Sequence, residues 1–509
     1  MNEGSKWRAK AENSCVRIEA YTTKVDFSRP DIKPRQHGAT GTGFFVPSKI
    51  VGSNAEKWYS ILTCAHVVDG CHADEISVIF PKVGRQRFNK NVQIQAVCPQ
   101  YDLAVLLIRI DDPQIQNNIQ TMELSPNMPV GSSVSAFGYP LGQFGLTGST
   151  GEYGAFQKGQ YQHNADISPG NSGGPLVRND TGQCVGVNAS TIYGGAASGV
   201  HYAVPIGLYM RLANDMLKGS RIPISPPKLG ICYHTATKAL IEKISKRAGL
   251  SAGGDETGAY VHYVFKTSAA AKLGITTGSL VKSIQWEIGD GNWSTVHHLD
   301  RHGETLTSFS GSQKVGLQYL LERIPIRSTI RVNMIKKNED GTHAPTTIEG
   351  KMESFNDGSY RYYSSPLEKI PDYCFFAGIC VMRLCANHQE NFPALFQKMS
   401  PEQREMDNLV VTSTLPNYSD IPFPEGSIIQ YVNGKGVDKH FEPSEGRMDT
   451  LEKYRNALCE NDGYIEIVTT TKRMYTLKLA DVVERENVAR KNNIYTPDQL
   501  LLKCLKIDM

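Results

Sequence analysis

The sequence predicts a mainly β fold, in which a β-barrel or sandwich domain is followed by two copies of a smaller β-rich domain. Up to about residue 205, short apolar or alternating runs recur between Gly, Pro, Asn and Asp residues, among them GTGFFVPS, WYSILTCAHVV, DLAVLLIRI and CVGVNAS. Strands at this spacing are typical of an all-β barrel or sandwich. The length of 509 residues agrees with about three domains of roughly 150 residues each.

A helix is predicted to close the first domain. In PIGLYMRLANDMLKG, residues 205–219, the apolar period changes from two to nearly four. Ile206, Met210, Leu212 and Leu217 then share one face, and Gly219 is a stop signal. The next stretch, RIPISPPKLG, contains three prolines and cannot continue a helix. We therefore place the first domain at residues 1–220.

Two later segments resemble each other and predict a duplicated domain. They are AYVHYVFKTSAAAKLGITTGSLVKSIQ, residues 259–285, and NLVVTSTLPNYSDIPFPEGSIIQYVNG, residues 408–434. Each has a β-rich run, an irregular or helical piece, and then Gly-Ser followed by an apolar strand. We expect copies at 221–350 and 351–490, separated by the polar stretch 337–359, with 491–509 as a C-terminal surface tail.

Composition narrows the class of partner and the compartment. The net charge of +3 comes from 54 basic and 51 acidic residues spread along the chain, so neither nucleic acid nor a membrane surface is an expected partner. There is no apolar N-terminal signal segment and no run of about 18 apolar residues. Eleven cysteines without a CxxC pair indicate reduced thiols and no metal site. We expect a cytoplasmic or other reducing location, and no cofactor.

The stretch GNSGGPLV, residues 170–177, contains a candidate nucleophile. A serine needs a neighbouring base and a third group that orients the base. In LTCAHVV, His66 ends an apolar strand, and in YDLAVLLI, Asp102 precedes one. Taken singly, such a histidine is usually a strand-edge residue and such an aspartate a turn residue. Together, in the order His66, Asp102, Ser172 within one β-rich domain, they predict a catalytic triad.

The glycines around Ser172 predict an oxyanion hole. Backbone N–H groups stabilise a developing oxyanion when no Cβ obstructs the approach of the substrate. We expect the turn Gly170, Asn171, Ser172 to form this hole, with the N–H groups of Gly170 and Ser172 as donors. Gly173 and Gly174 would let the chain leave the cleft.

The first 215 or so residues resemble the trypsin-like domain of the HtrA/Deg family of serine proteases. The resemblance rests on TGTGFFV, LTCAHVV, YDLAVLLI, VSAFGYPLG and DISPGNSGGPLV. It implies a chymotrypsin-like double β-barrel with the triad in the cleft between the barrels. It also implies ATP-independent cleavage of unfolded or misfolded polypeptides, and homo-oligomers built from trimers.

The duplicated domain resembles the C-terminal PDZ domains of the same family. KLGICY, residues 228–233, and FFAGICV, residues 375–381, look like carboxylate-binding loops. The resemblance implies two α+β PDZ-like domains that bind peptide C-termini at Gly230 and Ile231, and at Gly378 and Ile379. For the second copy, a groove filled from within the chain is an equal alternative.

The resemblance leaves the cleavage preference open. Asp166 lies six residues before Ser172, the offset at which trypsin carries the acid that selects Lys or Arg. The family often has Thr-Asp where this chain has His163 and Asn164. We favour small or medium apolar residues at the cleavage point. The expected substrate-binding residues are Asp166, Ile167, Asn188, Ala189 and Ser190.

Two classes of function remain. One is a serine endopeptidase, of which a processing protease for one specific partner is a narrower form. The other is a non-catalytic peptide-binding scaffold or chaperone with an inert barrel. The intact motifs at His66, Asp102 and Ser172 favour the endopeptidase.

Overall fold

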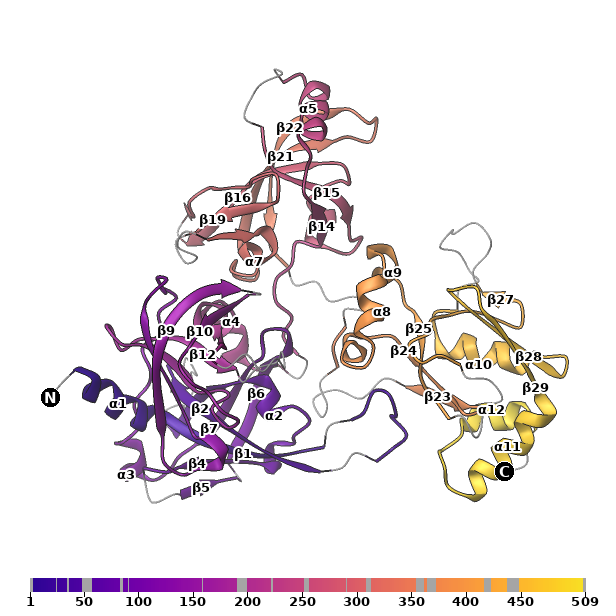
Figure 1. The fold of residues 1–509 in the computed structure, drawn as a ribbon, viewed down its shortest axis with the longest axis horizontal. Coiled ribbons are helices and arrows are strands. Elements are labelled where there is room, and N and C mark those ends of the chain that lie inside the picture. The colour runs from indigo at the N-terminus through magenta and orange to yellow at the C-terminus, as the bar shows by residue number, and fades with distance from the viewer. Residues whose placement is uncertain are drawn as a thin grey trace. The chain divides into compact units, whose positions relative to one another are not determined.

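The computed structural model describes residues 3–23, 25–33, 36–47, 57–82, 86–89, 91–157, 159–189, 199–220, 223–250, 256–289, 291–307, 313–353, 361–363, 372–415, 423–436 and 448–506. The chain forms two compact units. The first contains Met1–Thr22 and Gln36–Phe355, and the second contains Thr23–Arg35 and Asn356–Met509 (Figure 1).

The first unit begins with an antiparallel sheet of seven strands in the order β5-β4-β1-β2-β3-β7-β6. These strands are β1 (Cys15–Thr22), β2 (His37–Val46), β3 (Trp58–Thr63), β4 (Ile76–Phe80), β5 (Gln86–Phe88), β6 (Val92–Cys98) and β7 (Leu103–Arg109). Strand β7 is almost wholly buried, as its apolar and β-branched sequence LAVLLIR predicts. Helices α1 (Glu3–Ser14), α2 (Ala65–Val68) and α3 (Pro113–Gln116) flank these strands.

Six further strands close into a barrel in the order β10-β13-β12-β11-β8-β9. They are β8 (Ser133–Gly138), β9 (Thr147–Gln157), β10 (Gln160–His163), β11 (Pro175–Arg178), β12 (Cys184–Ala189) and β13 (His201–Pro205). Tyr153, Tyr161 and Leu176 are fully buried in its core. The mainly β fold predicted for the first domain is therefore confirmed, and the nucleophile motif leads into β11 of the barrel.

The predicted closing helix is present as α4 (Ile206–Lys218). Its buried face includes Ile206, Leu212 and Leu217 as expected, but Met210 is 42% exposed. The proline-rich stretch after α4 is packed along β6, because the N–H groups of Ser220 and Ile224 donate to the carbonyls of Gln95 and Val97.

Residues 223–353, called the first repeat below, form a sheet in the order β14-β15-β16-β21-β22. Its strands are β14 (Ile231–His234), β15 (Ala259–Val264), β16 (Leu280–Gly289), β21 (Thr329–Lys337) and β22 (His343–Lys351), with shorter strands β17 (Asn292–Trp293), β18 (His297–His298), β19 (Glu304–Leu306) and β20 (Lys314–Gly316). Its helices are α5 (Lys238–Arg247), α6 (Ala269–Lys272) and α7 (Leu317–Leu321). The polar stretch 337–359 does not simply separate the copies, because it contains all of β22.

Residues 372–506, the second repeat, contain two small sheets, β23-β24-β25 and β27-β26-β28-β29. The strands are β23 (Tyr373–Phe376), β24 (Ile379–Arg383), β25 (Leu409–Thr414), β26 (Ile429–Val432), β27 (Lys435–Gly436), β28 (Tyr464–Thr469) and β29 (Met474–Lys478). The helices are α8 (Pro393–Lys398), α9 (Pro401–Glu405), α10 (Leu451–Cys459), α11 (Leu479–Lys491) and α12 (Gln499–Cys504). The predicted surface tail 491–509 is wrong, because Leu501 and Leu502 of α12 are fully buried in the core of this unit.

The same pair of backbone hydrogen bonds occurs in both repeats. In the first, Val261 N–H donates to the Ser279 carbonyl and Gly278 N–H donates to the Val261 carbonyl. In the second, Val411 N–H donates to the Ser427 carbonyl and Gly426 N–H to the Val411 carbonyl. The shared Gly-Ser pattern thus marks an equivalent strand-to-strand junction, and the internal resemblance is confirmed at this level.

Cysteine pairing and surface charge complete the description. Cys459 and Cys504 form a disulfide, so the expectation that every thiol is reduced is wrong for this pair.

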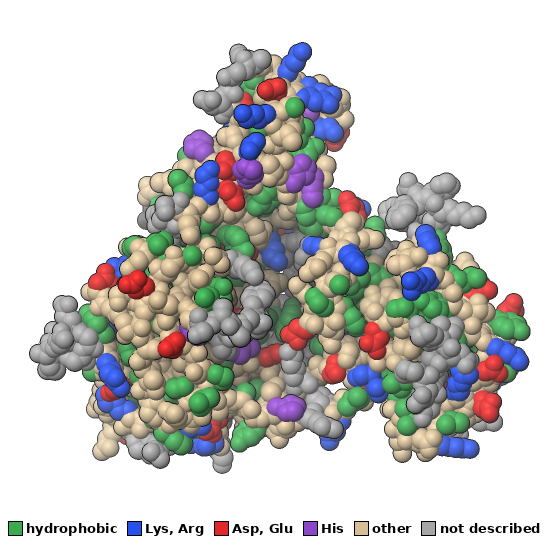
Figure 2. Space-filling view, viewed as in Figure 1, with side chains coloured by type: hydrophobic (Ala, Val, Ile, Leu, Met, Phe, Trp, Pro, Cys, Tyr) green, Lys and Arg blue, Asp and Glu red, His purple; other side chains and the backbone are tan. Residues whose placement is uncertain are grey.

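Figure 2 shows acidic and basic side chains interspersed over most of the face drawn, with Lys and Arg gathered near α5, where Lys243, Lys246 and Arg247 are exposed. Among the described residues, none of the helices has the length and apolar character needed to cross a membrane.

Candidate active site

His66 reaches the site from the one-turn helix α2, directly after β3. Its neighbours Ala65, Val67 and Val68 are buried, whereas His66 is exposed. The helix therefore anchors itself with apolar residues and presents the imidazole at the surface. Asp102 follows a 3-10 turn and adopts left-handed backbone angles, φ 54°, which place its carboxylate beside α2 just before β7 begins.

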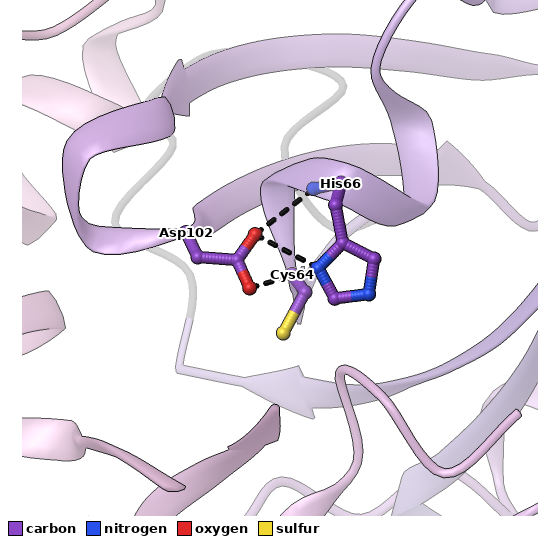
Figure 3. Close-up of side chains that lie close together, drawn as sticks. All are labelled: Cys64, His66 and Asp102. Atoms are coloured by element: carbon purple, nitrogen blue, oxygen red, sulfur yellow. Dashed lines mark hydrogen bonds and ion pairs between the residues drawn. The ribbon is translucent and has the colours of Figure 1, made fainter. Parts of the chain in front are cut away.

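Asp102 holds His66 by both backbone and side chain. Its Oδ1 accepts a hydrogen bond from the His66 backbone N–H at 3.0 Å. His66 Nδ1 lies 2.8 Å from Oδ2 and 3.0 Å from Oδ1 (Figure 3). Because Nδ1 carries its proton toward the carboxylate, Nε2 is the nitrogen that can accept a proton from a nucleophile.

Cys64 lies against the same carboxylate, as Figure 3 shows. Its sulfur, the His66 ring and the Asp102 carboxylate have atoms within 4.8 Å of one another, and the thiol donates to the Asn188 carbonyl at 3.3 Å. Burial, with the Asp102 charge as the second cause, raises the pKa of this thiol well above its usual value. Cys64 therefore packs beneath the dyad as a neutral thiol.

The nucleophile turn is locked onto β2 and α2. Thr42 N–H donates to the Ser172 carbonyl at 2.8 Å, and Thr42 Oγ1 donates to the Gly170 carbonyl at 2.7 Å. A Cβ on Gly41 would lie 2.6 Å from Val67 and 3.3 Å from the Ser172 carbonyl oxygen. Since Val67 follows His66, the turn that carries Ser172 packs directly beside the helix that carries His66.

The glycines of this turn are required by space and by backbone angles. Gly170 has φ +102° and Gly173 has φ +85°, values that other residues rarely adopt. An added Cβ would lie 2.4 Å from the Tyr139 carbonyl oxygen at Gly170, and 2.1 Å from the Thr42 carbonyl oxygen at Gly173. Both positions therefore require glycine for the turn to pack against its neighbours.

A single hydrogen bond orients the peptide before Gly170. Leu141 N–H donates to the Pro169 carbonyl at 2.7 Å. Because C=O and N–H point in opposite directions across a trans peptide, the Gly170 N–H points away from Leu141. The Asn171 N–H donates to the Ser168 carbonyl at 2.9 Å, so Asn171 contributes to the turn and not as an oxyanion donor.

The predicted substrate wall is only partly present. Asn188 is fully buried, its amide donates to the carbonyls of Phe137 and Pro175, and its backbone bonds to Gly173 and Gly174. Asn188 is therefore a structural residue of the barrel, and its assignment to substrate binding is wrong. Ala189 is also buried, and Ser190 lies outside the described residues.

Asp166 lies at the surface beside a histidine. Its side chain is 88% exposed, and its Oδ1 lies 3.5 Å from His201 Nε2. Ile167 packs against the barrel core. An acid that selects Lys or Arg sits at the base of a pocket, so the exposure of Asp166 does not favour tryptic specificity. Burial and the nearby His201 lower the pKa of His163, the cross-strand partner of His201, to about 4.

In the first repeat, the predicted carboxylate loop precedes an edge strand. Gly230 has φ +76° and would place a Cβ 2.1 Å from Ser268, so its position also requires glycine. Ile231 begins β14, which lies at the edge of the sheet and pairs with β15. Ile231 and Tyr233 pack against the same core as Leu317 and Leu320 of α7.

In the second repeat, the equivalent loop is occupied from within the chain. Strand β23 pairs with β24 along its length, and Ala377 and Gly378 form the tight turn between them with φ 55° and 70°. Ala377 N–H donates to Glu486 Oε1 at 2.6 Å, and Gly378 N–H donates to the Tyr495 hydroxyl at 3.2 Å. The Gly378 N–H is therefore not available to a peptide carboxylate, which contradicts the assignment of Gly378 and fits the internal alternative. The assignment of Ile379 stays a prediction.

The buried carboxyl group of Glu486 should make the stability of the protein depend on pH. Burial raises the pKa of Glu486 from 4.5 to about 7, although Tyr495 donates to it at 2.5 Å. Between pH 4.5 and pH 7 the folded state binds more protons than the unfolded state. The free energy of unfolding therefore falls as the pH rises, by on the order of 2 to 3 kcal/mol. Glu486→Gln should remove this loss, which calorimetry of the full chain at pH 5 and pH 8 would measure.

Glu484→Gln on the exposed side of the same helix is the matched control. It should leave the difference between the two pH values unchanged. A Glu486→Gln variant with the same pH dependence as the wild type would show that Glu486 does not titrate in this range.

Several residues that shape the site were missed in the sequence. Thr42 and Leu141 act through backbone groups or a single hydroxyl, and their spacing from Ser172 gives no local signal. Cys64 stands two residues before His66 inside the quoted motif LTCAHVV. It could have been found there, because a side chain at that position follows the same strand into the site.

Known proteins are similar to the first part of the chain. Residues 41–187 match the trypsin-like peptidase domain family. Putative serine protease HhoB of Synechocystis is 30% identical over 267 residues, covering 50% of this chain and 58% of that protein. A probable periplasmic serine endoprotease DegP-like of Hahella chejuensis is 32% identical over 262 residues, covering 49% of each. The structure of HtrA-type protease AlgW with tripeptide is 21% identical, covers 69% of this chain and 96% of that one, and has a TM-score of 0.45.

The seven-stranded sheet and the closed barrel, with the Asp102–His66 pair and the glycine-rich serine turn, agree with the match to a trypsin-like peptidase domain. Over about half of its length the chain is similar to HtrA-type and DegP-like serine proteases. It spans about half the length of curated relatives such as these. Relatives are named as periplasmic and as chloroplastic, and they give the predicted cytoplasmic location no support.

Proposed function

We propose that the chain is a serine endopeptidase that cuts polypeptides through an acyl-enzyme. The observation that carries this proposal is the double attachment of His66 to Asp102, next to a serine whose turn packs against the same helix. An inert scaffold has no need to hold an exposed imidazole in one tautomer. The buried positions of Asp102 and Ser172 agree with a preorganised site.

In the proposed reaction, Ser172 Oγ attacks the scissile carbonyl carbon while His66 Nε2 takes the hydroxyl proton. The tetrahedral intermediate collapses, the C–N bond breaks, and His66 gives the proton to the departing amine. A water molecule then attacks the acyl-enzyme with His66 again as base, releasing the new carboxyl end and Ser172. Asp102 keeps Nδ1 protonated and stabilises the transient imidazolium.

The N–H groups of Gly170 and Ser172 are the proposed oxyanion donors. Gly170→Ala should force the turn to move, because the new Cβ would meet the Tyr139 carbonyl at 2.4 Å. Loss of one donor lowers kcat by about 10² to 10³, which initial rates on a fluorogenic peptide would measure. Gly145→Ala is the matched control, since nothing lies within 4 Å of its Cβ position. Equal rates for both variants would exclude Gly170 from the hole.

Covalent labelling tests the proposal directly. A fluorophosphonate should bond through phosphorus to Ser172 Oγ with loss of fluoride, and mass spectrometry of the digest should find the adduct on the peptide containing GNSGGPLV. His66→Ala should slow labelling strongly. A folded chain that takes no label, with or without unfolded casein present, would favour the scaffold function.

The finer parts of the proposal concern substrate and partners. The proposed substrates are unfolded or misfolded polypeptides, cut without ATP after small or medium apolar residues. A processing protease for one specific partner is a narrower form of the same function.

The open edge of β14 is the proposed site for peptide C-termini. The second repeat, with its turn at Ala377 and Gly378 already occupied, is proposed to be structural. Homo-oligomers built from trimers are proposed from the family resemblance.

A further inference from the structure

Leu141 combines two features that are unusual for a leucine. Its side chain is 73% exposed, the largest exposed fraction among the large hydrophobic residues of the described chain. Its backbone is left-handed, with φ 52° and ψ 28°, and it is the only large apolar residue among the described non-glycine residues with positive φ. Glycine or asparagine adopts this conformation at a lower cost than a branched side chain does. Such an outlier points to a use for the leucine side chain itself.

Leu141 lies directly beside the nucleophile turn. Its N–H donates to the Pro169 carbonyl at 2.7 Å, and a Cβ on Gly170 would lie 3.1 Å from the Leu141 nitrogen. Gly170 is one of the proposed oxyanion donors. The exposed leucine side chain therefore stands next to the surface that a substrate must cross when its scissile carbonyl enters the oxyanion hole.

The loop that carries Leu141 rests on the seven-stranded sheet. The Tyr139 N–H donates to Thr42 Oγ1 of β2 at 3.0 Å. A Cβ on Gly142 would lie 4.0 Å from Thr40 Cγ2, also on β2. Both neighbours of Leu141 in the sequence region 139–142 thus contact the strand that holds the Ser172 turn.

The same sheet carries the residue that serves the leaving half of the substrate. His66 gives its proton to the departing amine, so the chain after the scissile bond lies toward His66 and α2. Helix α2 follows β3 of this sheet, and its Val67 would lie 2.6 Å from a Cβ on Gly41 of β2. In contrast Ile167, predicted to contact the residue before the cut, packs against the core of the barrel.

We propose that Leu141 contacts the first or second substrate residue after the scissile bond and favours an apolar side chain there. Covering an exposed leucine with another apolar side chain removes apolar surface from water, which is favourable. Phe144, three residues further on and 39% exposed, extends the apolar surface of the loop. The contact rests on the proposed endopeptidase function, because it requires a substrate bound across Ser172.

Competition for the acyl-enzyme of the full wild-type chain tests the contact. The thiobenzyl ester of a tripeptide ending in valine should acylate Ser172, and leucyl-glycinamide, glycyl-leucinamide or glycyl-glycinamide then competes with water. The amine nitrogen bonds to the acyl carbon, the bond from that carbon to Ser172 Oγ breaks, and His66 carries the amine proton to Oγ. Chromatography measures the ratio of transfer product to hydrolysis product. We expect this ratio to be about tenfold higher with a leucine-containing amide than with glycyl-glycinamide.

Variants at position 141 assign this preference. Leu141→Asn introduces a residue that tolerates left-handed backbone, so the melting temperature should not fall, while the leucine preference should shrink to about twofold or less. Leu141→Met should restore most of the preference. Ile288→Asn is the matched control, since Ile288 is 64% exposed in the first repeat, and it should keep the full preference. The ratio compares two fates of one acyl-enzyme, so a variant that slows both reactions equally leaves it unchanged.

The possible outcomes separate the contact from the proposed reaction. Equal transfer to all three amides in the wild type would overturn the contact, and so would an unchanged leucine preference in Leu141→Asn. A folded wild-type chain that forms neither transfer product nor hydrolysis product would contradict the proposed endopeptidase, and the role of Leu141 with it.

Discussion

Ser172→Ala is expected to abolish digestion of unfolded casein, with a loss of about 10⁴ to 10⁶ in turnover. Without Oγ there is no atom to form the acyl bond, while the turn keeps its shape. Its hydrogen bonds with Thr42 use the Ser172 carbonyl and the Gly170 carbonyl, and neither depends on the serine side chain. The variant should therefore fold as the wild type does, and mass spectrometry of the products would measure the loss.

Ser132→Ala serves as the control for this experiment. Ser132 lies in an exposed turn just before β8 of the barrel, where its hydroxyl donates to the Pro129 carbonyl, and the variant should digest casein normally. Residual digestion by Ser172→Ala near the wild-type rate would contradict the proposed nucleophile. It would mean that the cleavage comes from a contaminating protease or from another residue.

The ends of the casein products also test the substrate preference. Apolar residues before the cuts would agree with an exposed Asp166 held beside His201. Cuts after Lys or Arg would mean that Asp166 is drawn into the substrate pocket on binding. Asp166→Asn would then shift the cleavage sites without changing the reaction.

The pairing of His66 with Asp102 could be predicted from the sequence, and Ser172 proposed as their partner, because each of the three residues lies in a local motif. His66 follows a strand within four residues, Asp102 precedes one, and Ser172 stands among glycines that only a tight turn requires. Such motifs are defined by neighbouring residues, so they can be recognised in the sequence before the fold is known. The mainly β class and helix α4 were predictable for the same reason.

The assignments that failed depend on contacts between distant residues. Asn188 lies near the end of the run CVGVNAS, but its side-chain amide donates to the carbonyl of Phe137, 51 residues away. Glu486 reaches Ala377 from 109 residues further along the chain. Helix α12 appeared to be a tail because a short helix has no strong period, and only packing reveals Leu501 and Leu502 as core.

Asp102→Asn is expected to lower kcat/KM by about 10⁴ at neutral pH. In the wild type, Oδ1 accepts the His66 backbone N–H, and Oδ2 lies closest to Nδ1. Only the carbonyl oxygen of asparagine can accept the backbone bond, so its NH₂ group must take the place of Oδ2. The amide then donates to Nδ1 and forces the proton onto Nε2, where it blocks uptake of the Ser172 proton.

The melting temperature separates this tautomer effect from a folding defect. The buried thiol of Cys64 and the backbone bond to His66 should hold the new asparagine side chain in the place of the Asp102 carboxylate, so the variant should keep the wild-type melting temperature. Asp111→Asn, an exposed carboxylate paired with Lys57, is the control and should retain full activity. Activity of Asp102→Asn within tenfold of the wild type at pH 7 would show that His66 does not need the carboxylate to carry its proton on Nδ1.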